Sequence, residues 1–155
     1  MREVETLPQI VDLDNDEIAA LLKRTHQGHL GLSREDHPYV VPITFAYDAP
    51  HVYFFTTEGQ KTEFIDVNPL VCLQVEEVRD PHNWKSVILN GKAGRLTDNE
   101  SVERAMRLIR AINPRLAPAW SIRWMDDSIR SNVAVVYRIE VDSSSGRATL
   151  PAEKR

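Results

Sequence analysis

One lysine, Lys61, stands where it can bind an anion. A polar loop from Thr56 to Gln60 precedes it, and Thr62 follows it at the start of a predicted helix. The positive end of a helix dipole disfavours a lysine, so a bound anion would relieve a local conflict. The ammonium group, the first N–H groups of the helix and the hydroxyls of Thr56, Thr57 and Thr62 together suit a phosphate.

Each of these residues also has an ordinary structural explanation. Lys61 can be a solvated lysine that opens a surface helix. Threonines are common at strand ends because β-branched residues favour strands. The residue types therefore predict a phosphate site and leave the solvated alternative open.

A second group of candidates lies in the strand predicted over 39–47. Pro42 has no N–H to give to a ladder, so it belongs on a sheet edge, at a bulge or beside something other than a strand. The backbone of Pro42, Ile43 and Thr44 is therefore a candidate for ligand contact, with a plain edge strand as the alternative.

Trp84 and Ser86 follow an exposed turn over 79–83. Trp84 can stack on a flat ring or plug the end of a barrel, and Ser86 can hydrogen-bond a ligand oxygen. Gly91, further along the same strand, permits close backbone approach or a bulge.

The other polar residues define no further site. The histidines have no metal-ligand spacing, so no metal is expected: His26, His29, His37, His51 and His82. The chain has no P-loop, no Gly-x-Gly-x-x-Gly and no ordered serine–histidine–aspartate set. The single cysteine, Cys72, excludes an intrachain disulfide and is expected to be core filler.

The bulk composition is that of one ordinary domain of 155 residues. The net charge of −4 argues against general nucleic-acid binding, which requires a basic surplus. No run approaches the roughly 20 apolar residues of a membrane span, and residues 1–8 lack a signal-peptide core. We therefore expect a cytoplasmic protein with no nucleic-acid or membrane partner.

Hydrophobic periodicity predicts six strands, over 28–33, 39–47, 51–56, 70–78, 84–96 and 133–141. Helices are predicted over 16–26, over 61–67, from a capping box at Thr97 and Glu100 to Pro114, and around 118–127. Residues 1–13 are expected to be an N-terminal arm and 142–155 a C-terminal tail. Strands in hairpin-like succession favour an antiparallel barrel with flanking helices.

In this order the sequence resembles the FMN-binding split β-barrel proteins related to pyridoxamine 5′-phosphate oxidase, closest to the nitroimidazole-resistance branch. The matching pieces run from about residue 16 to 147: Gly28–Leu32, Pro38–Tyr47, Val52–Phe54, Glu58–Lys61, Asn68–Cys72, Trp84–Val87, Gly91–Ala93, Tyr137–Val141 and Gly146-Arg147. No single piece is specific, and the specificity lies in their order and spacing.

The resemblance implies one mainly β domain, a six-stranded antiparallel split barrel, that forms a homodimer with FMN at the interface. The strand at Val41–Thr44 then lies beside the flavin ring, and the loop at Thr56–Thr62 holds the phosphate. The segment at Trp84–Ser86 contributes to the same site, often from the other subunit. The FMN-binding residues implied are Val41, Pro42, Ile43, Thr44, Thr56, Thr57, Lys61, Thr62, Trp84 and Ser86.

The resemblance further implies a flavin-dependent oxidoreductase that acts on a small molecule. Proteins of the nitroimidazole-resistance type often carry a histidine after the Tyr-Phe of the third strand, where this chain has Phe55. This departure puts histidine-based reductase chemistry in doubt and leaves the catalytic residues unassigned. The alternatives are a non-catalytic or sensing flavin-binding protein, or a related split barrel that holds deazaflavin F420 or haem.

Overall fold

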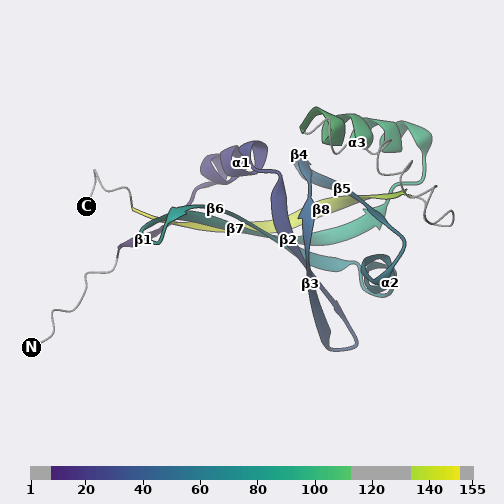
Figure 1. Ribbon diagram of the computed structural model, residues 1–155, viewed down its shortest axis with the longest axis horizontal. Helices are drawn as coiled ribbons and strands as arrows, with labels where there is room; N and C mark the ends of the chain where they lie inside the picture. Colours follow the sequence, from purple (N-terminus) through teal and green to yellow (C-terminus); the bar gives the residue numbers. More distant parts are fainter. Residues whose placement is uncertain (1–7, 113–133, 151–155) are drawn as a thin grey trace, which may run out of the picture.

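The computed structural model describes residues 8–112 and 134–150 (Figure 1). The elements in chain order are β1 (Ile10–Asp12), α1 (Asn15–Arg24), β2 (Gln27–Arg34), β3 (His37–Thr44), β4 (Ala46–Asp48), β5 (His51–Thr57), α2 (Gln60–Val67), β6 (Leu70–Asp80), β7 (Asn83–Arg95), α3 (Asn99–Ile112) and β8 (Ala134–Thr149). The helix predicted around 118–127 lies outside the described residues.

The strands form one antiparallel sheet in the order β3-β2-β6-β7-β8-β5-β4, with β1 beside β8. Its two ends, β3 and β4, are separated in sequence only by Phe45. The sheet must therefore curl until its edges meet there, although no ladder closes it. At this seam the Phe45 N–H donates to the His26 carbonyl oxygen at 2.8 Å. The mainly β, split-barrel prediction is confirmed.

The predicted number of six strands is not confirmed, because the described residues form a sheet of eight. The strand expected over 39–47 is divided at Phe45, whose N–H bonds outside the ladder, and β1 adds a strand in the expected N-terminal arm. Pro42 lies on β3, at one edge of the sheet, as expected for a residue that cannot donate.

The inner face of the sheet carries the main core. Alternate residues of β6, Val71, Leu73 and Val75, are buried, and Phe54 of β5 stacks on Tyr137 of β8 with ring centroids 5.2 Å apart. Cys72, which stands between Val71 and Leu73 in the sequence, lies on the opposite face of β6 and is partly exposed. The expectation that it fills the core is therefore wrong. Successive side chains of a strand point to opposite faces of the sheet, which explains why Val71 and Leu73 are buried and Cys72 is not.

The helices cover parts of this sheet from different sides. In Figure 1, α1 and α3 lie above the long strands, and α2 lies below them. Asp14 caps α1, with its carboxylate accepting from the Glu17 N–H at 2.8 Å. Within the described residues, no helix is long and apolar enough to cross a membrane.

Two predicted boundaries are corrected. Asp98, not Thr97, caps α3, because its carboxylate accepts from the Ser101 N–H at 2.9 Å. The C-terminal tail does not begin at 142, since β8 continues to Thr149 and pairs with β7 and β1. Residues Asp142 to Ser145 are exposed, yet three of them pair with β7, which side-chain polarity alone does not reveal.

Candidate functional site

A hollow of about 490 Å³ opens on the outer face of the sheet, beside the seam. It is lined by β2, β3 and β6 residues: Gln27, Gly28, His29, Pro42, Ile43, Thr44 and Glu76. The ladder brings them together, with Thr44 opposite Gln27 and Pro42 opposite His29. This volume falls in the range of small-molecule sites. Three predicted site residues, Pro42, Ile43 and Thr44, therefore share one hollow.

A chain of polar side chains runs along the edge of the hollow. His29 Nδ1 lies 3.2 Å from Gln74 Oε1. The Gln74 amide in turn lies 3.3 Å from the Ser86 hydroxyl and 3.4 Å from a Glu76 carboxylate oxygen. Ser86, predicted from the sequence, is thus linked to the hollow through a glutamine that the sequence did not single out.

Two other predicted residues do not line the hollow. Val41 is partly buried and packs against the main core, because its side chain points to the inner face. Trp84 is half-buried, and its backbone N–H donates to the Thr149 hydroxyl at 3.0 Å. Trp84 and Ser86 share a face of β7, since they are two residues apart.

The predicted phosphate loop forms a separate part of the molecule, at the N-terminus of α2. Lys61 is half-buried, and its ammonium has no hydrogen-bond or ion-pair partner among residues 8–112 and 134–150. Burial lowers the pKa of Lys61 below its usual value. A cation that has lost water without gaining an anion is electrostatically unsatisfied.

The first turn of α2 adds unused donors. Gly59 is the N-cap residue and has no side chain to accept from the helix. In the described part of the chain, no hydrogen bond uses the N–H groups of Gln60, Lys61 or Thr62. These groups and the Lys61 ammonium are therefore available together to an anion.

The predicted threonines are used differently. The Thr62 side chain is fully buried, accepts from the Gly59 N–H at 3.0 Å and lies 2.9 Å from a Glu58 carboxylate oxygen. Its hydroxyl therefore holds the loop and is not free for a ligand. The Thr56 hydroxyl makes only a long contact of 3.4 Å with the Thr57 carbonyl oxygen. Thr56 and Thr57 are partly exposed.

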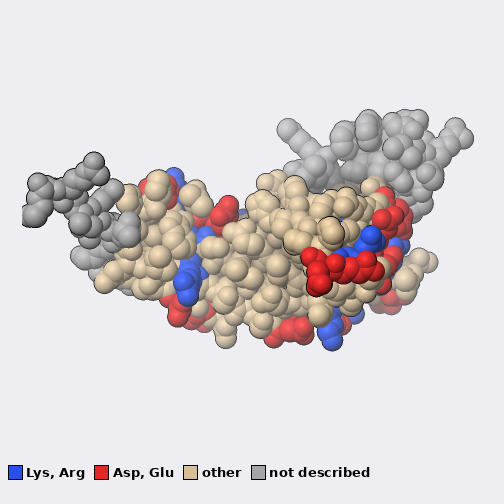
Figure 2. Space-filling model, turned by 90° about the horizontal axis from the view of Figure 1, so that it is seen from below, with Lys and Arg blue, Asp and Glu red and all other residues tan. Residues whose placement is uncertain are grey.

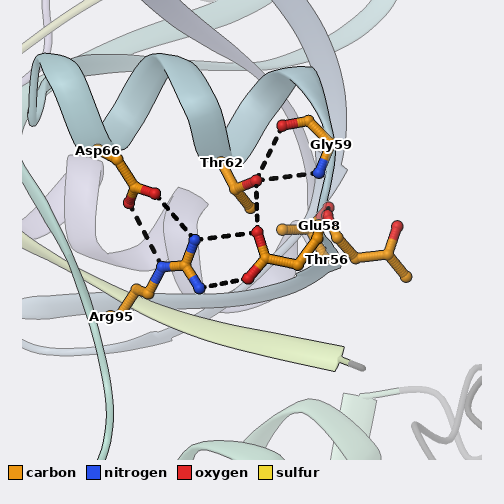
Figure 3. A network of polar contacts seen from close by, with 7 residues as sticks. Thr56, Glu58, Gly59, Thr62, Asp66 and Arg95 are labelled. Carbon is orange, nitrogen blue, oxygen red and sulfur yellow. Dashed lines mark hydrogen bonds and ion pairs between the residues drawn. The ribbon is translucent and has the colours of Figure 1, made fainter. Parts of the chain in front are cut away.

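An arginine from a distant strand completes the loop, as Figure 3 shows. The Arg95 guanidinium, at the end of β7, forms an ion pair with Glu58, with a second contact of 3.0 Å. It also binds the Asp66 carboxylate at 3.0 Å. These hydrogen bonds raise the pKa of Arg95 and hold the pKa of the Glu58 carboxyl below its usual range.

Sequence reasoning missed the residues that support both parts of the site. Glu58 and Arg95 are 37 positions apart, so no local spacing connects them. His29 was expected to be an ordinary surface histidine, yet it lines the hollow. The alternation of polar Gln27 and His29 with buried Gly28 and Leu30 was the one available signal.

Phe55, at the position where the resemblance led us to look for a histidine, is half-buried. It packs against a small core cluster beneath α3 that includes Tyr53, Val136 and Met106. Its ring therefore serves packing, and the described residues offer no histidine at that place.

On the face that Figure 2 shows, the charges of the described residues do not gather into a basic patch. Figure 2 shows one face on which Lys and Arg lie among Asp and Glu, mainly toward its margins, and the middle is largely uncharged. This face offers no extended basic surface for a polyanion.

Comparisons with known proteins agree with this fold. The sequence pattern of pyridoxamine 5′-phosphate oxidase matches residues 14–148. An uncharacterized protein of Rhizobium meliloti (strain 1021) is 25% identical over 149 residues, which cover 91% of this chain and 96% of the relative.

Two solved structures are similar throughout. A FAD-binding protein from Mesorhizobium loti has a TM-score of 0.75 and 27% identity, over 91% of this chain and 99% of the other. A candidate 5-nitroimidazole antibiotic resistance protein from Bacteroides thetaiotaomicron has a TM-score of 0.70 and 20% identity, over 96% and 95% of the two chains. With the family pattern matching nearly the whole chain, the protein belongs to the pyridoxamine 5′-phosphate oxidase family.

Proposed function

We propose that this protein binds FMN and holds its phosphate at the N-terminus of α2. The observation that carries the proposal is Lys61, half-buried without an anionic partner in the described residues, beside the free N–H groups of the first helical turn. A phosphate dianion satisfies both the ammonium and these donors. Thr56 and Thr57 supply hydroxyls at the open side of the loop.

The flavin ring lies, in this proposal, in the hollow formed by Pro42, Ile43 and Thr44. Its volume of about 490 Å³ supports this, as does the FAD-binding protein of Mesorhizobium loti, which is 27% identical. FAD carries the same ring and the same first phosphate, so the α2 site suits either flavin. We favour FMN because the described site provides for one phosphate.

We further propose a homodimer with the flavin between subunits. Exposed apolar side chains support this, because Val40, Val78 and Ile88 are 64%, 59% and 43% exposed and share the outer face with the hollow. Pairing such a face with a second copy would bury this surface and bring Trp84 and Ser86 of one subunit toward the ring of the other.

The proposed activity is oxidation or reduction of a small molecule. A bound flavin supplies the electron transfer, while the protein binds the phosphate and shapes the space beside the ring. The residues given contain no Gly-x-Gly-x-x-Gly, and in this proposal a nicotinamide donor stacks on the open face of the ring.

A non-catalytic or sensing flavin-binding protein is the second candidate. Phe55 favours it, because this residue occupies a packing position where a histidine would serve reductase chemistry. Both candidate functions require flavin binding, so only the reactivity of the bound flavin distinguishes them.

The binding proposal is tested by the absorption spectrum of the purified protein, followed by titration with FMN, FAD and riboflavin. Oxidised-flavin bands, or saturable binding with FMN preferred over riboflavin, support it. A colourless protein that binds neither FMN nor FAD would contradict it. A Soret band would point instead to haem, and selective binding of deazaflavin F420 to that cofactor.

Reactivity is tested by mixing the FMN-loaded protein anaerobically with NADH or NADPH. Bleaching of the flavin band supports an oxidoreductase driven by pyridine nucleotides. A band that stays unchanged with both donors, in a protein that binds FMN, favours the non-catalytic candidate. Sedimentation in the same buffer measures whether the flavin-loaded species is a dimer.

A further inference from the structure

Glu58 is a competitor for the anion site. It lies in the loop directly before α2, three positions from Lys61. Carboxylates are favoured at helix N-termini for the same reason as phosphates. A Glu58 side chain that was free to turn toward the first turn of α2 would neutralise Lys61 and repel an incoming phosphate.

Arg95 removes this competition in the structure. Its guanidinium binds the carboxylates of Glu58 and Asp66 through two contacts each, and the Glu58 carboxylate also lies 2.9 Å from the Thr62 hydroxyl in the first turn of α2 (Figure 3). The guanidinium carbon also lies over the buried Tyr137 ring, 5.7 Å from its centroid. Glu58 is thus held in one place by a strand that is distant in sequence.

The charges near Lys61 on the loop and on α2 are mainly negative. Glu58, Glu63 and Asp66 place three carboxylates on the loop and α2, against one lysine. Without Arg95, this segment would have a net negative charge at the position where a phosphate is to bind. Arg95 pairs with Glu58 and Asp66 and halves the net charge of this group from −2 to −1, which lessens the competition that Lys61 faces from these carboxylates.

We infer that Arg95 is a positioning residue for phosphate recognition: it pairs with Glu58 beside the α2 N-terminus and so keeps Lys61 available to the phosphate of the flavin. The inference rests on the proposed function. It predicts an effect that depends on the phosphate, whereas a purely structural brace between β7 and α2 would affect all flavins alike.

The test compares FMN and riboflavin affinities for the unmodified protein and for Arg95→Met, Glu58→Gln and the double variant. Methionine keeps an unbranched apolar side chain but not the charge. We expect Arg95→Met to weaken FMN binding about tenfold or more and riboflavin binding less than about twofold. Glu58→Gln keeps a hydrogen-bond acceptor for Thr62, and it should restore FMN binding in the Arg95→Met background to within about threefold.

Arg104→Met is the matched control. Arg104 pairs with Asp48 at 3.0 Å between α3 and β4, so this variant removes the same charge and one ion pair away from the loop. FMN affinity should not change. Thermal unfolding without ligand reports whether each variant keeps its fold, and Arg95→Lys, which keeps the charge, should retain most of the FMN affinity.

The outcomes separate the two proposals. If the unmodified protein binds no flavin, the proposed function fails. If it binds FMN but Arg95→Met binds FMN equally well, or the double variant stays as weak as Arg95→Met, the role of Arg95 is overturned. Should Arg95→Met not fold, Glu58→Gln alone decides, because a loss of FMN affinity in that variant contradicts the inference and an unchanged or higher affinity supports it.

Discussion

The Thr62 hydroxyl accepts a hydrogen bond from the Gly59 N–H at 3.0 Å and is fully buried. A residue that the sequence offered as a phosphate ligand is therefore part of the support of the loop. This contact stabilises the N-terminus of α2, because Gly59 is the N-cap residue and has no side chain that could cap the helix. In the proposed site, Lys61 and the free N–H groups are the groups that remain for the phosphate.

Thr62→Val should accordingly reduce stability. Valine keeps the shape but leaves the Gly59 N–H without its acceptor, which costs about 1–3 kcal/mol. Urea unfolding of the flavin-free protein measures the loss. Thr57→Val is the control, because the Thr57 hydroxyl has no hydrogen bond in the described residues, and its stability should change by less than about 0.5 kcal/mol. Equal losses in both variants would contradict the support role of Thr62.

Lys61 gives a pH dependence to flavin binding. Burial lowers its pKa from the usual 10.5, so the ammonium loses its charge at a lower pH than an exposed lysine. FMN affinity should be full below this lowered pKa and fall as the pH rises through it, because the neutral amine no longer attracts the phosphate.

Lys61→Ala should weaken FMN binding by at least about tenfold, on the order of 1.4 kcal/mol, at neutral pH. Lys61→Arg should keep the affinity and lose its alkaline decline, since arginine stays protonated. Fluorescence titrations at a series of pH values measure both effects. The same alkaline decline in Lys61→Arg would assign the titration to another group.

The hollow makes a prediction about the flavin ring. Thr44→Trp would fill part of the space beside Pro42 with an indole, so FMN affinity should fall by at least about tenfold while the apo protein unfolds at a similar temperature. His37→Trp, at the exposed far end of the same strand, is the control and should bind FMN normally. Unchanged FMN affinity in Thr44→Trp would contradict the proposal that the flavin ring lies in the hollow.

Gly91 is required where β7 shifts register against β8. A Cβ at this position would lie 2.1 Å from the Glu140 carbonyl oxygen, so Gly91→Ala forces the two backbones apart. We expect a loss of about 1–3 kcal/mol. Gly94→Ala, on the same strand but with nothing within 4 Å of its Cβ, should change stability by less than about 0.5 kcal/mol. Comparison of their unfolding midpoints in urea tests both values.

The amino-acid sequence alone determined the local features of this protein. Alternating apolar residues predicted β6 and its buried Val71, Leu73 and Val75, and the acidic residues before Ile18 predicted the start of α1. The position of Lys61 at a helix start was also predicted correctly. These features depend on hydrogen bonds and side-chain periodicity within a few residues, which any short stretch of sequence carries.

The tertiary structure alone decided how distant segments meet. The pairing of Arg95 with Glu58, the division of one predicted strand at Phe45 and the meeting of Gln27, Thr44 and Glu76 around one hollow all depend on strand register and on the closure of the sheet at its seam. Each such contact joins residues whose separation carries no periodic signal. Lys61 therefore predicted an anion site from the sequence, and only the fold showed that Arg95 meets Glu58 beside it.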